Sequence, residues 1–299
     1  MDKFISLAEK LDFKYALNEP MSRHTSMKVG GNADFAVFPK SDVHIAQIVK
    51  LAKKENVKLT VLGNGSNVLV SDNGLRGVTM ILGKDFSEIK YLGDGIIFAQ
   101  AGAMLTKLCR TALDLSLSGL EFAFGIPGSC GGAAFMNAGA YGGEMKDVLI
   151  KCTHVTPDGE ISELSAEELD LSYRHSVYED NGCIVTGVFV KLREDDKKSI
   201  EEKMTDFMTR RKTKQPLEYP SAGSTFKRPE GYFAGALIEE CSLKGKQIGG
   251  AQVSEKHAGF LINIGNATCE DFKQLIDYIK ETVLKEKGVE LETEVRFLD

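Results

Sequence analysis

Apolar positions in the first sixty residues predict a strand, a helix and a second strand. Residues 33–38 form an apolar run, and Ser41 follows it as a suitable helix cap. The next apolar residues have the spacing of one helix face, and they are Ile45, Ile48, Val49 and Ala52. Residues 57–62 then resume as a strand. This order predicts a βαβ unit.

Similar stripes predict elements further along the chain. Helices are expected at 105–112, 200–208 and 272–283, and strands at 148–155, 184–192 and 295–297. Thr268 and Asp271 resemble a capping box for the last of these helices, and Gly288 is placed to end it. The charged segment 194–198 separates the strand-rich middle from the last third, so we expect the main domain boundary there.

The composition of the chain excludes some classes of protein. The chain has 299 residues, which is roughly two domains at about 150 residues each. Hydrophobic residues make up 42% and charged residues 27%, which excludes a disordered chain. Lys and Arg number 37 against 43 Asp and Glu, for a net charge of −6. This balance argues against a nucleic-acid binder, so local cations must hold any anionic ligand.

The longest uncharged stretch is 122–143, which is long enough to raise the question of a membrane span. Seven of its residues are Gly and one is Pro127, so we interpret it as a loop with buried backbone. The N-terminus has no secretory signal, and the six cysteines include no C-x-x-C pair. We therefore expect a cytoplasmic protein with reduced thiols and no membrane partner.

A glycine-rich turn follows the second predicted strand. Its residues are Gly63, Asn64, Gly65, Ser66 and Asn67. Val68 occupies the place of the third glycine in a dinucleotide-binding G-x-G-x-x-G motif, and no P-loop motif occurs. The backbone N–H groups of this turn are suited to surround a pyrophosphate. A simple Asn-Gly turn between strands is the alternative, and it is the more frequent one.

A second glycine-rich segment runs from Gly125 through Ile126, Pro127, Gly128, Ser129 and Cys130 to Gly131, Gly132 and Ala133. Small residues leave its main chain accessible, and the absence of charge suits a large planar ring. A flavin needs both backbone donors and apolar walls. Close packing at a domain interface is the alternative.

The segment 221–229 joins Ser224 to the cations Lys227 and Arg228, which suits a diphosphate, although a surface turn is the commoner case. Glu292 and Glu294 flank Thr293 and are either paired acid–base carboxylates or edge charges. The five histidines, His257 among them, have no metal-ligand spacing, and no nucleophile elbow occurs.

Taken in order, these motifs resemble one family, the UDP-N-acetylenolpyruvoylglucosamine reductases. The resemblance covers nearly the whole chain and is carried by 24–31, 63–67, 125–140, Tyr173-Arg174, 223–229 and 291–297. It implies an α+β fold with a two-domain FAD-binding unit of the vanillyl-alcohol-oxidase type and a C-terminal α+β substrate-binding domain. The implied domains are 1–85, 86–197 and 198–299. The length resembles the shorter subtype, which lacks an extra tyrosine-bearing loop.

The resemblance also implies a reaction and the residues that perform it. Noncovalent FAD, reduced by NADPH, converts an enolpyruvyl UDP-sugar to UDP-N-acetylmuramate for peptidoglycan. Arg174 and Glu294 are implied to stabilise the developing enediolate, and Ser224 to protonate the carbanionic carbon. Tyr173, Lys214, Lys227 and Arg228 are implied to meet the substrate. FAD is implied to lie on the glycine turn 63–67 and on Gly125, Ile126, Pro127, Gly128, Ser129, Gly132 and Ala133.

Two other functions compete with this one. An FAD-dependent oxidoreductase of the same superfamily would share the first two domains, but 223–229 and Glu294 match the reductase. A nucleotide-sugar-binding regulator would be indicated by loss of Arg174, Ser224 or Glu294, and all three are present. We expect a monomer that binds a UDP-sugar and NADPH and binds no nucleic acid.

Overall fold

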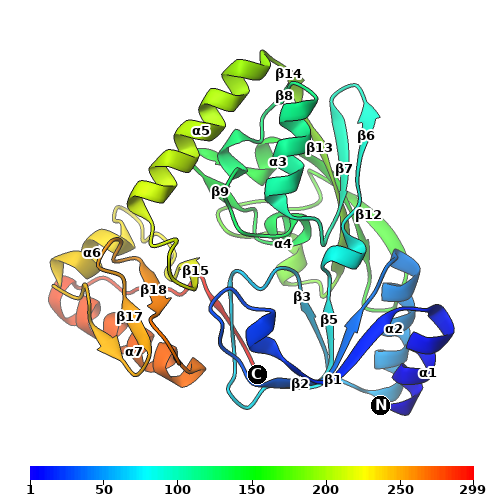
Figure 1. Cartoon of the computed structure of the whole chain (residues 1–299), viewed down its shortest axis with the longest axis horizontal. Helices are drawn as coiled ribbons and strands as arrows, with labels where there is room; N and C mark the ends of the chain where they lie inside the picture. The colour runs from blue at the N-terminus through cyan, green and yellow to red at the C-terminus, as the bar shows by residue number, and fades with distance from the viewer. The chain divides into compact units, whose positions relative to one another are not determined.

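The computed structural model describes all 299 residues, which form two compact units (Figure 1). The first unit contains Met1–Leu17, Phe35–Asn64 and Gly77–Arg210. The second contains Asn18–Asp34, Gly65–Arg76 and Arg211–Asp299. Two N-terminal segments therefore belong with the C-terminal third, an association between residues far apart in sequence. No helix is both long and apolar enough to cross a membrane.

Seven α-helices and nineteen strands make up the chain. The helices are α1 (Asp2–Leu11), α2 (Asp42–Glu55), α3 (Leu105–Asp114), α4 (Cys130–Phe135), α5 (Lys197–Lys214), α6 (Ala234–Glu240) and α7 (Cys269–Lys287). The strands are β1 (Lys14–Pro20), β2 (Asn32–Phe38), β3 (Leu59–Leu62), β4 (Val68–Val70), β5 (Leu75–Ile81), β6 (Ile89–Gly93), β7 (Ile96–Gln100), β8 (Leu117–Ser118), β9 (Gly139–Ala140), β10 (Gly143–Glu144), β11 (Leu149–Val155), β12 (Ile161–Ser165), β13 (Ile184–Lys191), β14 (Arg193–Glu194), β15 (Ser221–Ser224), β16 (Gln247–Ile248), β17 (Ala251–Val253), β18 (Phe260–Asn263) and β19 (Arg296–Leu298).

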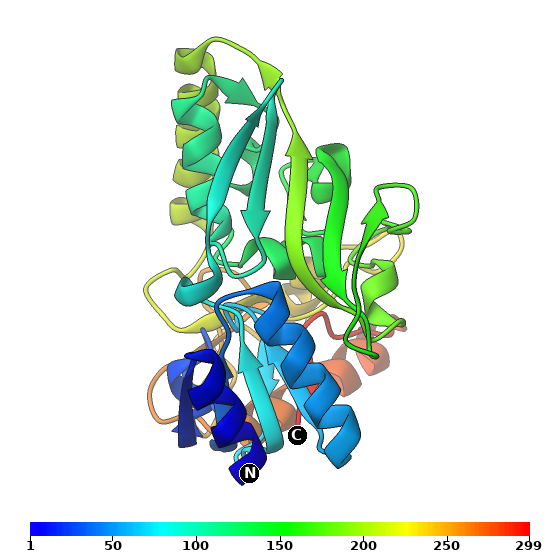
Figure 2. The ribbon, with the colours of Figure 1, turned by 90° about the vertical axis from the view of Figure 1, so that its right-hand side faces the viewer.

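Two sheets organise the N-terminal two-thirds. One has the strand order β1-β2-β5-β3, in which β3 and β5 are parallel. The other is an antiparallel sheet with the order β12-β11-β13-β7-β6, and α2 packs against β11 and β12 (Figure 2). The predicted βαβ segment is confirmed as β2, α2 and β3, with β5 inserted between β3 and β2 in the sheet.

The predicted apolar stripes of α2 and α3 are buried as expected, whereas in the stripe predicted at 200–208 Phe207 and Met208 are only half-buried. All four stripe residues of α2 lie in the core of the first unit, and Leu105, Leu108, Cys109 and Ala112 of α3 lie there too. The Ser41 hydroxyl accepts a hydrogen bond from the His44 N–H at 3.2 Å, as predicted for a cap. Such a cap contributes about 1 kcal/mol to helix stability.

Helices α1, α4 and α6 were not expected from the sequence. The uncharged stretch 122–143 contains α4 in place of a continuous loop. The Ser129 hydroxyl caps α4 by accepting a hydrogen bond from the Gly132 N–H at 3.3 Å. Ala133 and Ala134 are buried against the core, so tertiary packing stabilises a segment whose glycine content alone disfavours a helix.

The second unit has its own sheet, with the order β15-β18-β17-β16, and its own core. The predicted capping box of Thr268 and Asp271 starts α7, and Gly288 ends it at φ 68°. Asp72 also caps α7, because its two carboxylate oxygens accept the N–H groups of Cys269 at 2.8 Å and Glu270 at 3.0 Å. Together with the parallel pairing of β19 and β4, this contact explains why residues 65–76 belong to the second unit.

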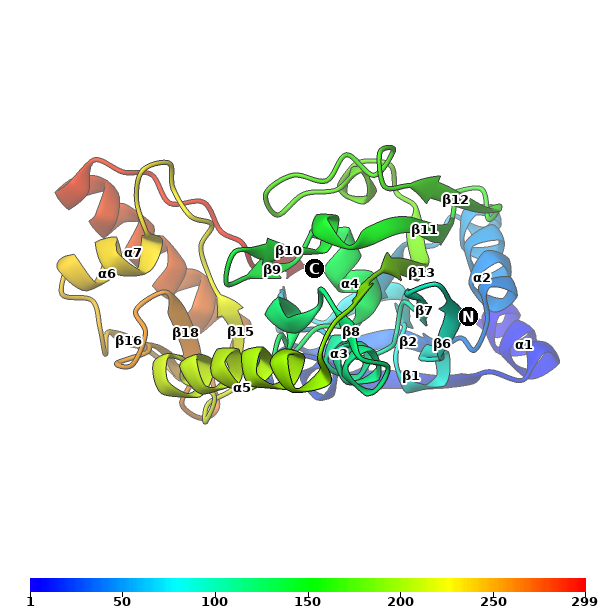
Figure 3. The same ribbon diagram turned by 90° about the horizontal axis from the view of Figure 1, so that it is seen from above.

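Helix α5 is the longest element that continues from the first unit into the second (Figure 3). It begins at Lys197, so the charged segment 194–198 is partly helical and only partly a link. Ile200 and Met204 are its buried residues. The Phe207 ring stacks on Tyr141 with centroids 4.6 Å apart, which holds α5 to the tip of the β9–β10 hairpin.

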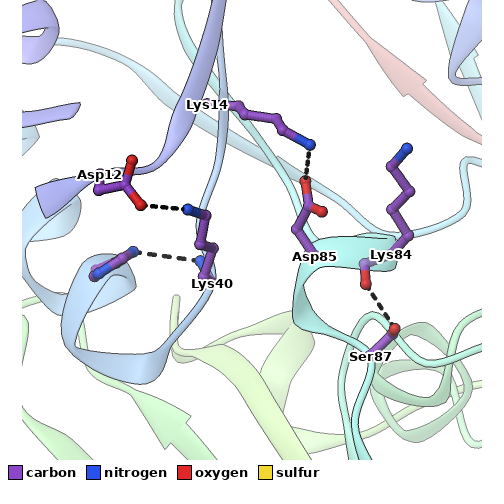
Figure 4. Close-up of polar contacts among 7 residues, drawn as sticks. Asp12, Lys14, Lys40, Lys84, Asp85 and Ser87 are labelled. Carbon is purple, nitrogen blue, oxygen red and sulfur yellow. Dashed lines mark hydrogen bonds and ion pairs between the residues drawn. The ribbon is translucent and has the colours of Figure 1, made fainter. Parts of the chain in front are cut away.

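Ion pairs on the surface tie loops of the first unit together (Figure 4). Lys40 pairs with Asp12 at 2.8 Å, and Lys14 pairs with Asp85 at 3.3 Å. These groups are largely exposed, so water screens them and their contribution to stability is small. The six cysteines are free thiols, and all except Cys183 are buried.

Candidate active site

The first glycine-rich turn directly follows β3. None of the backbone N–H groups of residues 63–66 donates a hydrogen bond within the chain. Consecutive unbonded N–H groups of this kind form a concave anion-binding site. The side chains at both ends of the turn are fixed: the Asn64 amide donates to the Pro127 carbonyl, and the Asn67 amide donates to the Glu294 carbonyl.

The structure brings the two glycine-rich segments together. A Cβ atom at Gly63 would overlap the Ser129 hydroxyl, so only glycine permits this approach. The N–H groups of Gly128 and Ser129 also donate no hydrogen bond within the chain. Within the first unit, main chain without side-chain bulk at Gly63 therefore packs closely against Ser129, and both segments carry unbonded N–H donors. These residues fit the diphosphate of a dinucleotide cofactor.

Tyr173 and Arg174 form the tip of a tight turn in the first unit. Ser172 and His175 exchange two backbone hydrogen bonds across it, each 3.2 Å long. Arg174 has a φ of 57°, a left-handed conformation that few non-glycine residues adopt. Its guanidinium donates to the Gly139 carbonyl at 3.2 Å and lies 5.0 Å from the centre of the Tyr173 ring. Strained backbone of this kind is common at functional sites.

Ser224 and Glu294 lie on neighbouring segments of the second unit. Ser224 is the last residue of β15 and is paired with Phe260 of β18, with its side chain exposed. The Glu294 N–H donates to the Thr225 carbonyl at 2.8 Å, and Phe226 bridges to Thr293. The backbone pairing therefore places the predicted serine and the predicted carboxylate on adjacent stretches of chain.

The predicted cations of the second unit have distinct surroundings. Lys227 forms an ion pair with Glu292, and the two residues are also joined by a hydrogen bond from the Lys227 N–H to the Glu292 carbonyl at 2.8 Å. The Arg228 guanidinium lies 3.9 Å from the centre of the Phe233 ring. Lys214 is the exposed last residue of α5. Lys227 is therefore held in place by Glu292 through both its side chain and its backbone.

Two residues that hold the Arg174 turn and its neighbouring hairpin, Asn137 and Glu144, were not predicted from the sequence. Asn137 is completely buried in the turn after α4, and its amide donates to the Glu144 carboxylate at 2.9 Å. Asn137 is the one amide in the uncharged stretch 122–143, and a buried amide in such a stretch needs partners. This isolated amide was the feature of the sequence that could have indicated the role of Asn137.

His257 is half-buried and lies against Phe260, the residue of β18 that is paired with Ser224. Its ring lies edge-on to Phe260, with centroids 4.9 Å apart, and its Nδ1 accepts a hydrogen bond from the Gly259 N–H at 3.1 Å. Burial lowers the pKa of His257 below its usual range. The folded protein therefore holds this histidine neutral.

We expect the free energy of unfolding to fall as the pH drops below about 6.5, the ordinary pKa of histidine, because the unfolded chain then binds the proton more readily. His257→Asn keeps an acceptor near the Nδ1 position and cannot titrate. Urea unfolding between pH 8 and pH 5 should show a smaller loss of stability in this variant. Parallel pH profiles for the two proteins would contradict this assignment.

Two family models match the chain. One, described as UDP-N-acetylenolpyruvoylglucosamine reductase, C-terminal domain, matches residues 215–298. The other, described as FAD binding domain, matches residues 33–165. The two matches correspond to the two parts of the fold that the sequence predicted.

Relatives are similar along nearly the whole chain. The UDP-N-acetylenolpyruvoylglucosamine reductase of Syntrophomonas wolfei is 50% identical over 280 residues, which cover 94% of this chain and 93% of that protein. The crystal structure of the Thermus caldophilus reductase superimposes with a TM-score of 0.82 at 34% identity and covers 96% of this chain and 99% of that one. An alkyldihydroxyacetonephosphate synthase superimposes with a TM-score of 0.51 at 19% identity over 65% of this chain and 40% of its own, which shows the fold alone. The predicted α+β architecture is confirmed.

Proposed function

Because this chain belongs to the UDP-N-acetylenolpyruvoylglucosamine reductase family, we infer that it reduces UDP-N-acetylenolpyruvoylglucosamine to UDP-N-acetylmuramate in peptidoglycan synthesis, with FAD as its cofactor. The observation that carries this conclusion is similarity through both the FAD-binding part and the C-terminal part. A general FAD-dependent oxidoreductase would share only the first of these. NADPH is our proposed reductant.

The two glycine-rich segments are our proposed FAD site. The unbonded N–H groups of residues 63–66, together with those of Gly128 and Ser129, would bind the diphosphate. Ile126, which is partly exposed, would line the ring, whereas Ala133 is buried in the core and would support the segment from behind. Asn64 would hold the two segments together through its hydrogen bond to Pro127. FAD, when bound, carries hydride from NADPH to the enolpyruvyl group of the sugar.

Arg174 and Glu294 are the proposed stabilisers of negative charge on the substrate. Addition of hydride to the alkene pushes charge onto the neighbouring carbon and its carboxylate. The guanidinium of Arg174 would attract that charge, and a protonated Glu294 would donate a hydrogen bond to it. One preorganised donor at such a position typically lowers the activation free energy by about 3–4 kcal/mol.

Ser224 is the proposed proton donor to the carbanionic carbon. Its exposure at the end of β15 leaves the hydroxyl accessible to a ligand, and its segment is paired with that of Glu294. A serine hydroxyl is a weak acid, so a nearby positive charge must assist it, and Lys214 is our candidate. Tyr173, Lys227 and Arg228 are the proposed substrate contacts, the two cations facing the diphosphate.

Several finer properties are also proposals. We expect a monomer that works in the cytoplasm and binds neither nucleic acid nor membrane. Residues 1–85 and 86–197 are proposed as the two FAD-binding domains, with residues 198–299 as the substrate-binding domain. The discontinuous second unit is consistent with a C-terminal domain that recruits 18–34 and 65–76.

The purified protein should be yellow, with the absorption of oxidised flavin. Under anaerobic conditions NADPH should bleach this colour, and the enolpyruvyl UDP-sugar should restore it. A protein that is bleached by NADPH but reoxidised only by other acceptors would indicate a different oxidoreductase. Binding of the sugar without any colour change would indicate a regulator.

A further inference from the structure

Asn137 connects three segments of the first unit. Its amide nitrogen donates to the Glu144 carboxylate at 2.9 Å and to the Ser172 carbonyl at 2.8 Å, and its oxygen accepts the Lys146 N–H at 2.9 Å. An amide side chain can donate and accept in this way, whereas a carboxylate cannot donate. Asparagine also tolerates the left-handed backbone found here, where φ is 42°. Both requirements favour asparagine at this position.

The Ser172 carbonyl that Asn137 holds belongs to the turn that carries Arg174. The turn is anchored a second time at Ser176, two residues after Arg174. The Ser176 side chain is completely buried, and its hydroxyl donates to the Phe135 carbonyl. The backbone on both sides of Arg174 is therefore fixed to the end of α4. Fixed ends allow the left-handed conformation of Arg174 to persist.

The Arg174 side chain is directed by the β9–β10 hairpin. Its guanidinium donates to the Gly139 carbonyl, and Gly139 is paired with Glu144 across the hairpin. The Glu144 carboxylate also accepts a hydrogen bond from the Lys146 ammonium at 2.9 Å. That bond, the Asn137 amide and the charge of Arg174 hold the pKa of Glu144 below its usual range. Glu144 therefore contacts both groups that hold Arg174: it accepts from the Asn137 amide and pairs with Gly139 across the hairpin.

We propose that Asn137 and Glu144 are positioning residues for Arg174: Asn137 fixes the turn that carries it, and Glu144 fixes both Asn137 and the hairpin strand whose Gly139 carbonyl accepts from the guanidinium. Neither residue is proposed to touch the substrate. This inference rests on the proposed role of Arg174. Since a preorganised cation loses effect when it is misdirected, the two residues contribute to the transfer to the sugar and not to bleaching by NADPH.

The test measures the two half-reactions separately, by stopped-flow absorbance of the flavin-loaded enzyme. Glu144→Ala should slow reoxidation by the enolpyruvyl UDP-sugar about 10- to 100-fold, as expected for loss of a charged hydrogen-bonding partner. Glu144→Gln keeps an acceptor for Asn137, so it should recover part of that loss. Asn137→Asp places two carboxylates together and should resemble Glu144→Ala. Bleaching by NADPH and flavin content should change little in the Glu144 variants, although Glu144→Ala should lower the melting temperature because it leaves the buried Asn137 amide without one acceptor.

Glu163→Gln is the matched control, because Glu163 forms a similar ion pair with Lys151 at 2.8 Å on an exposed strand. It should leave both half-reactions unchanged. Equal slowing of both half-reactions in Glu144→Ala would indicate a merely structural role and overturn the inference. The inference would also be overturned if both Glu144 variants were reoxidised by the sugar at the wild-type rate while Arg174→Lys was reoxidised slowly. If Arg174→Lys itself reoxidises normally, the failure lies in the proposed role of Arg174.

Discussion

Ser224→Ala is expected to slow turnover strongly while NADPH still bleaches the flavin at the wild-type rate. Removing the hydroxyl takes away the proposed proton donor of the second half-reaction and leaves the first untouched. A positioned general acid typically contributes about 10²- to 10⁴-fold, so reoxidation by the enolpyruvyl UDP-sugar should slow by that factor. Stopped-flow absorbance, with NADPH and the sugar added in sequence, measures both rates.

Ser221→Ala is the control for this prediction. Ser221 lies at the start of the same strand, β15, and is paired with Ile262 of β18. It should show normal rates in both half-reactions. Normal reoxidation in Ser224→Ala would reject the serine as proton donor, and slow bleaching by NADPH would show that the substitution disturbs the FAD site.

Gly65→Ala should strongly destabilise the protein and reduce its flavin content. Gly65 has a φ of 58°, and a Cβ atom there would overlap the carbonyl oxygen of His24. That oxygen is backbone and cannot rotate away. The left-handed strain of about 1–2 kcal/mol and an overpacking cost of about 1–3 kcal/mol add to roughly 2–5 kcal/mol. Urea unfolding and the ratio of flavin to protein absorbance test both effects.

Gly288→Ala is the control that carries only the backbone strain, so its difference from Gly65→Ala measures the steric part of the cost. Gly288 has a similar φ of 68°, but a Cβ atom there would meet nothing within 4 Å. This variant should lose only the strain energy and keep its full flavin content. Comparable losses in the two variants would mean that the close approach of His24 to the turn is unimportant.

Local patterns predicted much of the fold correctly. The apolar stripes of α2, α3 and α7 and the caps at Ser41 and Thr268 lie where the sequence placed them. Helix periodicity and capping involve residues within four positions of one another, so sequence alone reveals them. Helix α4 was missed because its stability comes from burial of Ala133 and Ala134, which glycine-rich local sequence does not reveal.

The candidate site was predicted only in part for the same reason. The motifs around Ser224, Arg174 and the glycine turn were found from residue types and their order. Asn137 and Glu144 were missed, because their importance depends on contact with the Ser172–His175 turn, some thirty residues away.

By itself the sequence determined four periodic helices, the caps at Ser41 and Thr268, and the family resemblance from which the site residues are proposed. Only the tertiary structure decided that Gly63 packs against Ser129, that Asp72 caps α7 and that Asn137 holds the Arg174 turn. The physical reason is the range of the interactions. Helix periodicity and capping act over one or two turns of chain, whereas these contacts form only when the burial of apolar surface has brought distant segments together.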